Sequence, residues 1–171
     1  VGVDGGIAGE RTSVRPGVAH KGWNAYRCRG NGKAAQSSLT TQGCNASERA
    51  ARVIGHMRDL AEMWRSEGPF DEFYDVPYTT ITTNQIAGGI AMNTIPDACE
   101  FTYEFRNLAS VPPQQVQERI GAYAQRELLP SMQREFAGAR VEIDKLAAAP
   151  GLDASEQAAI TQLVRALTGD E

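Results

Sequence analysis

The chain has 171 residues, of which 42% are hydrophobic and 22% are charged, and its formal net charge is -4. This length and composition indicate one soluble globular domain with a sizeable core. The small acidic excess argues against binding to nucleic acid or to an anionic membrane, because both need clustered Lys and Arg. The longest apolar runs are also too short to cross a membrane.

The three cysteines are widely spaced. Cys28, Cys44 and Cys99 form no CxxC pair, and they are too few for a disulfide-stabilised secreted scaffold. The sequence also shows no basic and then apolar leader. We therefore expect reduced thiols and a cytoplasmic location.

The first half of the chain predicts strands and one long helix. Residues 17–31 place apolar side chains among polar neighbours and predict one or two strands. Residues 45–66 are the clearest helix, because apolar residues recur at steps of three and four until Gly68-Pro69. Residues 78–87 are rich in β-branched side chains and predict a strand that ends at Gly88-Gly89.

The second half repeats this alternation. Residues 98–108 alternate strictly between apolar and polar side chains, which predicts a strand with one apolar and one charged face. Pro112-Pro113 begins a second helix, whose apolar stripe continues until Pro130 disturbs it. A short strand over 140–146 follows, and an amphipathic helix ends the chain.

The predicted order is β-α-β-β-α-β with a helical tail. It favours an α+β fold of the ferredoxin-like kind, in which a four-stranded antiparallel sheet carries two helices on one face. The opposite face of the sheet is then available for binding.

The residues argue against three kinds of site: an RNA-binding platform, a closed zinc site and a serine nucleophile. An RNA-binding platform is disfavoured, because the 98–108 strand exposes Glu100 and Glu104 and lacks a basic-aromatic pattern. His20 and His56 alone are too few for a closed zinc site. The polar loop at 32–43 holds serines with no base nearby, so neither serine is expected to be a nucleophile.

Arg106 is the most informative charge. A guanidinium on the open face of a strand can bind a carboxylate through two parallel hydrogen bonds, or it can form an ion pair in the neighbourhood of Glu104 or Glu100. The residues alone leave these alternatives open. Asn93 reads as a turn residue before Thr94-Ile95-Pro96.

Four stretches in chain order resemble a known family. They are AGERTS at 8–13, AHKG at 19–22, GKAAQSSLTTQGCNASERAARVI at 32–54 and FYDVPYTTITTNQIAGGIAMNTIPDACEFTYEFRNL at 73–108. Together they resemble the acetylornithine deacetylase branch of the M20 family of zinc amidohydrolases. The resemblance covers nearly the whole chain, and its motifs are specific only in combination.

The resemblance implies a larger enzyme. Its members have a catalytic domain with two metal ions and, inserted in it, a ferredoxin-like dimerisation or lid domain. Residues 1–16 resemble the tail of the catalytic domain, 17–148 the dimerisation and lid domain, and 149–171 a helix that returns to the catalytic domain. The resemblance thus implies zinc or cobalt in the full-length enzyme, no cofactor in this fragment, a homodimer formed through the lid, and no activity of the fragment alone.

The resemblance also implies roles for five residues. Glu10 matches a metal-ligating glutamate of the family. Gln36 stands where the lid usually supplies a histidine that steadies the oxyanion in the partner subunit's site; a glutamine amide can donate there, but without charge. Asn93 and Arg106 match residues that face the substrate carboxylate, and Lys21 is a weaker candidate for substrate binding.

The implied reaction is hydrolysis of an N-acyl amino acid by metal-activated water, with N2-acetylornithine as the leading substrate. One alternative is another M20 amidohydrolase, such as a succinyl-diaminopimelate desuccinylase or a carboxypeptidase-like hydrolase. A second alternative is a catalytically inactive relative that is kept as a binding or assembly subunit. Two departures from the family pattern would mark it: Gln36 in place of the usual histidine, and Arg11 in place of the usual proline beside Glu10. No nucleic-acid or membrane partner is expected.

Overall fold

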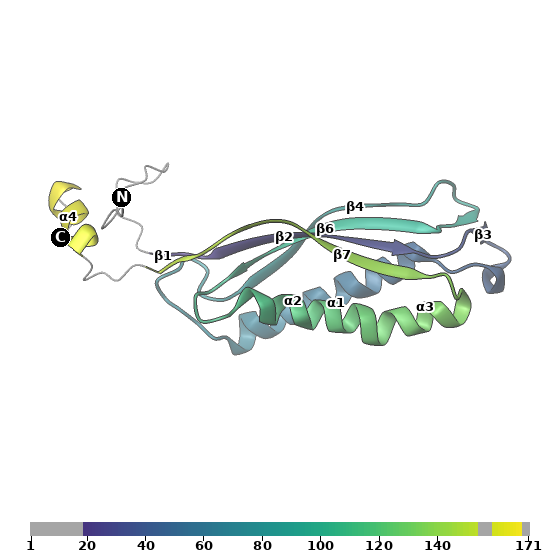
Figure 1. Cartoon of the computed structure of the whole chain (residues 1–171), viewed down its shortest axis with the longest axis horizontal. Helices are drawn as coiled ribbons and strands as arrows, with labels where there is room; N and C mark the ends of the chain where they lie inside the picture. Colours follow the sequence, from purple (N-terminus) through teal and green to yellow (C-terminus); the bar gives the residue numbers. More distant parts are fainter. Residues whose placement is uncertain (1–18, 154–158, 169–171) are drawn as a thin grey trace.

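The computed structural model describes residues 19–153 and 159–168, and its centre is one antiparallel sheet (Figure 1). The strands lie in the order β4-β6-β2-β7. Their bounds are Gly22–Asn31 for β2, Thr80–Gly88 for β4, Ala98–Asn107 for β6 and Arg140–Ala149 for β7. The helices α1, α2 and α3 cover one face of this sheet, which confirms the predicted ferredoxin-like α+β fold.

The first helix, α1, spans Ala46–Glu67. Asn45 caps it, because its side chain accepts a hydrogen bond of 3.1 Å from the backbone N–H of Glu48. Gly68 ends it with a φ of 75°, a left-handed value that glycine adopts without a steric penalty. The predicted helix over 45–66 therefore agrees with α1 to within a residue at each end.

The second helical region consists of three consecutive parts. They are α2 (Pro113–Ala122), the π-helical η2 (Tyr123–Leu128) and α3 (Leu129–Glu135). Pro130 was predicted to disturb this helix, and the regular α-helix does stop before it. The chain nevertheless remains helical, because the wider π turn precedes Pro130 and the proline then occupies the first turn of α3, where its missing N–H is tolerated.

The core lies between the sheet and the helices. The alternation along β6 is confirmed, because Phe101, Tyr103 and Phe105 are each 1% exposed or less while the intervening side chains lie on the open face. Val53 of α1 and Ile120 of α2 pack into the same cluster. Each such buried side chain stabilises the fold by about 1.5–3 kcal/mol.

Two short strand pairs define the ends of the sheet. β1 (Ala19–His20) pairs with β8 (Leu152–Asp153), and we call this the proximal end. β3 (Ala35–Gln36) pairs with β5 (Thr94–Ile95) at the opposite, distal end (Figure 1). A 3-10 turn, η1 (Thr40–Gln42), follows β3, and α4 covers Ala159–Thr168.

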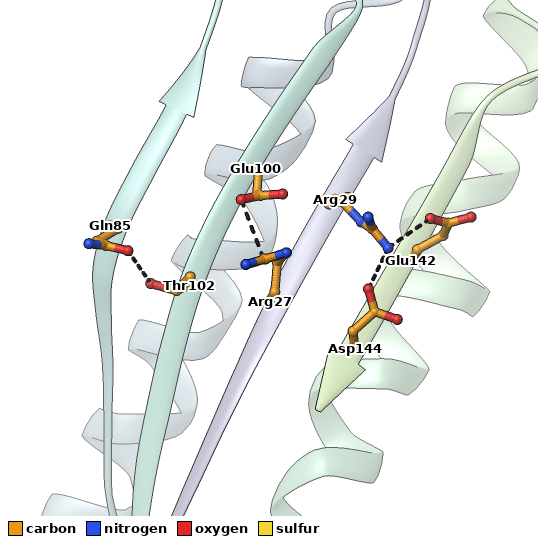
Figure 2. Close-up of polar contacts among 7 residues, drawn as sticks. All are labelled: Arg27, Arg29, Gln85, Glu100, Thr102, Glu142 and Asp144. Carbon is orange, nitrogen blue, oxygen red and sulfur yellow. Dashed lines mark hydrogen bonds and ion pairs between the residues drawn. The ribbon is translucent and has the colours of Figure 1, made fainter. Parts of the chain in front are cut away.

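The open face of the sheet is lined with polar side chains. Figure 2 shows its distal half, where Arg27 pairs with Glu100, Arg29 with Glu142 and Asp144, and Thr102 with Gln85. The charged side chains are 40–51% exposed, so each ion pair contributes only about 0.2–1 kcal/mol. These pairs tie neighbouring strands together and leave the face hydrophilic.

Candidate functional site

The distal end brings Gln36 and Asn93 together. Gln36 of β3 stands opposite Thr94 of β5, and the backbone N–H of Ser37 donates to the carbonyl of Asn93 at 2.9 Å. Both side chains are exposed, and neither side-chain amide has a hydrogen-bond partner within the described ranges. Two exposed amide groups therefore lie on neighbouring residue pairs of this tip, each available to a polar group from another molecule.

The backbone beneath this tip is fixed by a second set of contacts. Lys33 and Cys44 exchange two backbone hydrogen bonds of 2.9 Å, and the N–H of Gly32 donates to the carbonyl of Asp97 at 2.7 Å. A Cβ at position 32 would lie 2.0 Å from the Cys44 carbonyl oxygen, so only glycine fits there. The loop at 32–43 is thus a held support for Gln36.

Lys33 is a residue of this tip that the sequence analysis passed over. It lies three residues before Gln36, and its side chain is exposed. Its backbone N–H and carbonyl are both hydrogen-bonded to the backbone of Cys44. An ammonium group can stabilise developing negative charge more strongly than a neutral amide. The signal in the sequence was the only cation inside the polar loop at 32–43.

Arg106 lies on the open face near the proximal end, opposite Trp23 on one side and Thr80 on the other. Its Nε contacts a carboxylate oxygen of Glu104 at 3.2 Å, which is one of the two alternatives that the residues left open. Along β6, Arg106 is about 27 Å from Ala98 at the distal end, at about 3.4 Å per residue. One chain therefore does not bring Arg106 to Gln36 and Asn93.

Lys21 is also at the proximal end, where it is half-buried. Its ammonium donates to the backbone carbonyl of Tyr78 and lies 5.9 Å and 5.8 Å from the ring centroids of Tyr74 and Tyr78. Burial lowers the pKa of Lys21 below its usual value. These contacts fasten the start of the sheet to the segment before β4, which is a structural use of Lys21.

The described part of the chain holds no metal centre. Across residues 19–153 and 159–168, no three His, Cys, Asp or Glu side chains come together in a group that could hold a metal ion. His56 is stacked on Tyr123 with ring centroids 4.2 Å apart, while Glu10 lies outside the described residues. None of the helices in these ranges is both long and apolar enough to span a bilayer.

An open hollow of about 350 Å³ lies at the distal ends of β2, β4 and β6. Its charged lining is Arg29, Asp97 and Glu100, with glycine and alanine between them. Arg29 is already paired with Glu142 and Asp144. The one thiol in the lining, Cys99, is only 3% exposed. The hollow does not provide catalytic groups of its own.

Over residues 18–132 the chain matches the M20 family described as the peptidase dimerisation domain. The chain belongs to this family. Acetylornithine deacetylase from Pasteurella multocida is 30% identical over 169 residues, a match that covers 98% of this chain and 42% of the relative. Acetylornithine deacetylase from Myxococcus xanthus is 34% identical over 114 residues, covering 67% of this chain and 30% of the relative. The chain thus spans less than half the length of these enzymes.

Solved structures support the fold. The aminopeptidase PepT from Bacillus cereus matches with a TM-score of 0.61 at 17% identity, over 85% of this chain and 34% of that one. AtUAH in complex with glyoxylate matches with a TM-score of 0.66 at 15% identity, over 89% of this chain and 33% of that one. At such identities the likeness establishes the shared architecture of the domain.

Proposed function

We propose that the chain is the dimerisation and lid domain of a metal-dependent N-acyl amino acid deacylase, with N2-acetylornithine as the first substrate to test. The carrying observation is the 30% identity to an acetylornithine deacetylase over 98% of the chain. Zinc or cobalt, held by the rest of the full-length protein with Glu10, would supply the activated water. The protein would work in the cytoplasm, and the domain alone would be inactive.

The chain's own contribution would come from its two ends. The distal tip offers the exposed amides of Gln36 and Asn93 and the ammonium of Lys33, all of which can donate to an oxyanion or a carboxylate. The proximal end offers Arg106 for a substrate carboxylate, with Lys21 as a supporting cation. Because about 27 Å of sheet separates these ends, a site that uses both needs two copies of the domain.

A free edge strand supports such a homodimer. β4 and β7 are the two edges of the sheet. β7 carries charged side chains at Arg140, Glu142, Asp144 and Lys145, which discourage strand pairing, whereas β4 (TITTNQIAG) has none. Ile86 on β4 is also 58% exposed. We therefore place the dimer contact along β4, so that the two sheets continue into one another.

The test is hydrolysis of N2-acetylornithine by the full-length, metal-loaded protein, run beside its Gln36→His and Lys33→Ala variants. We expect activity in the parent, a gain in Gln36→His from the charged donor, and a loss in Lys33→Ala. Activity on N-succinyl-diaminopimelate or on a peptide instead would favour the other M20 hydrolases. No activity on any of these substrates, with much less than two metal ions bound per chain, would favour a non-catalytic subunit.

A further inference from the structure

Three side chains at the proximal end of the open face form one connected unit. The indole Nε1–H of Trp23 donates to Oε2 of Glu104 at 2.8 Å, and the Nε–H of Arg106 donates to Oε1 of the same carboxylate at 3.2 Å. The guanidinium of Arg106 also lies over the Trp23 ring, 5.6 Å from its centroid. Glu104 thus accepts hydrogen bonds from both Trp23 and Arg106, and Trp23 contacts both Glu104 and Arg106.

The sheet register creates this unit. Trp23 stands directly opposite Arg106 on the neighbouring strand, while Ala25 stands opposite Glu104. All four side chains share the open face, because positions two apart on a strand point the same way. Ala25, opposite Glu104, carries only a methyl group on this face.

The unit leaves the outer part of Arg106 available. Only Nε of its three nitrogens has a partner among the described residues, so Nη1 and Nη2 form an unused fork. The Arg106 side chain remains 40% exposed, although the indole and the carboxylate fix two sides of it. A fork that is already held in place loses less rotamer freedom when a carboxylate binds.

We propose that Trp23 and Glu104 are positioning residues, which hold Arg106 so that its Nη1/Nη2 fork receives the α-carboxylate of an acyl amino acid. This inference rests on the substrate-binding role of Arg106 proposed above. It adds that recognition of the carboxylate depends on Glu104, which accepts a hydrogen bond from Arg106, and on the ring of Trp23. Neither residue contacts the substrate. Glu104 takes up the Nε–H, so the carboxylate binds end-on to the fork.

The same face supplies a matched control. Arg27 contacts Glu100 through its Nε at 3.4 Å, with both side chains about as exposed as Arg106 (Figure 2). Glu100 is on the same strand as Glu104 and points the same way, but no indole completes its unit. Glu100→Gln therefore removes an equivalent charge from the same face without touching Arg106.

The experiment measures kcat and KM of the full-length protein for N-acyl amino acids, each as the free carboxylate and as the carboxamide. Glu104→Gln and Trp23→Phe should each raise KM for the carboxylate about fivefold, the effect of losing one partly exposed charged contact. In both variants kcat should change less than twofold, and the preference for carboxylate over carboxamide should fall. Arg106→Lys should do the same more strongly, and Glu100→Gln should do neither.

Two results would overturn the inference, and they are distinguishable. If Arg106→Lys raises KM while Glu104→Gln and Trp23→Phe do not, Arg106 binds substrate without these residues, and only the positioning role fails. If Arg106→Lys leaves KM and the carboxylate preference unchanged, the proposed role of Arg106 fails as well. Circular dichroism melting of each variant separates both results from unfolding, and the conservative Trp23→Phe keeps the ring in place.

Discussion

The proposed dimer contact along β4 predicts the effect of Ile86→Lys on self-association. Burying a whole isoleucine side chain contributes about 1.5–3 kcal/mol, and 58% of Ile86 remains to be covered. Each copy then contributes about 0.9–1.7 kcal/mol, and the two copies of a symmetric interface about 2–3.5 kcal/mol. The dimer dissociation constant should therefore rise about thirtyfold to three-hundredfold, since each 1.4 kcal/mol is a factor of ten.

The assay is sedimentation velocity over a concentration series that spans the dissociation constant of the parent. Leu146→Lys is the matched control, because Leu146 is 47% exposed on the opposite edge strand, β7. Its dissociation constant should stay near that of the parent. Equal dimerisation in the parent and Ile86→Lys, or a loss confined to Leu146→Lys, would refute the placement of the contact on β4.

Three further outcomes are expected. Arg49 hydrogen-bonds Glu135 and holds the pKa of that carboxyl below its ordinary 4.5. The pair therefore stabilises the fold above about pH 4.5, and this gain is lost progressively as the pH falls through the lowered pKa. Glu135→Gln should lower the melting temperature more at pH 7 than at pH 3, and an equal loss at both would contradict the linkage. All three cysteines are buried, and burial raises the pKa of Cys28 to about 12; a thiol reagent should modify them only after denaturation, and rapid labelling of the native protein would contradict this. Gly32→Ala should push the backbone away from the Cys44 carbonyl and lower activity of the full-length protein as Gln36 moves, whereas Gly55→Ala, with open space around its Cβ, should not.

The long strands and helices of the main fold were predictable from local patterns. Ten residues of β6 repeat the two-residue alternation, and α1 shows several turns of the helical one. The pairs β1–β8 and β3–β5 have two residues per strand, which is too short for any pattern. Their partners are also far apart in the chain, so only the folded backbone reveals them.

The candidate site was predictable in part. Alternation correctly assigned Arg106 to the open face and made Glu104 a possible partner, because both facts depend on neighbours within one strand. The contribution of Trp23 depends on the register between β2 and β6, which no local pattern specifies. The distance between Arg106 and Gln36 could not be predicted either. It depends on which strands pair at each end of the sheet, and the sequence does not specify this.

This separation leads to a prediction about mixed dimers. If Gln36 of one copy and Arg106 of the other serve the same site, a dimer of one Gln36→Ala chain and one Arg106→Ala chain has one site with both defects and one site with none. Random mixing makes half of the dimers mixed, so about a quarter of all sites should regain the parent's activity. If both residues served a site within one copy, every site would keep a defect and mixing would restore nothing. Measuring kcat before and after the two variants are co-refolded therefore tests whether a sheet with its binding groups at opposite ends is completed by a second copy of itself.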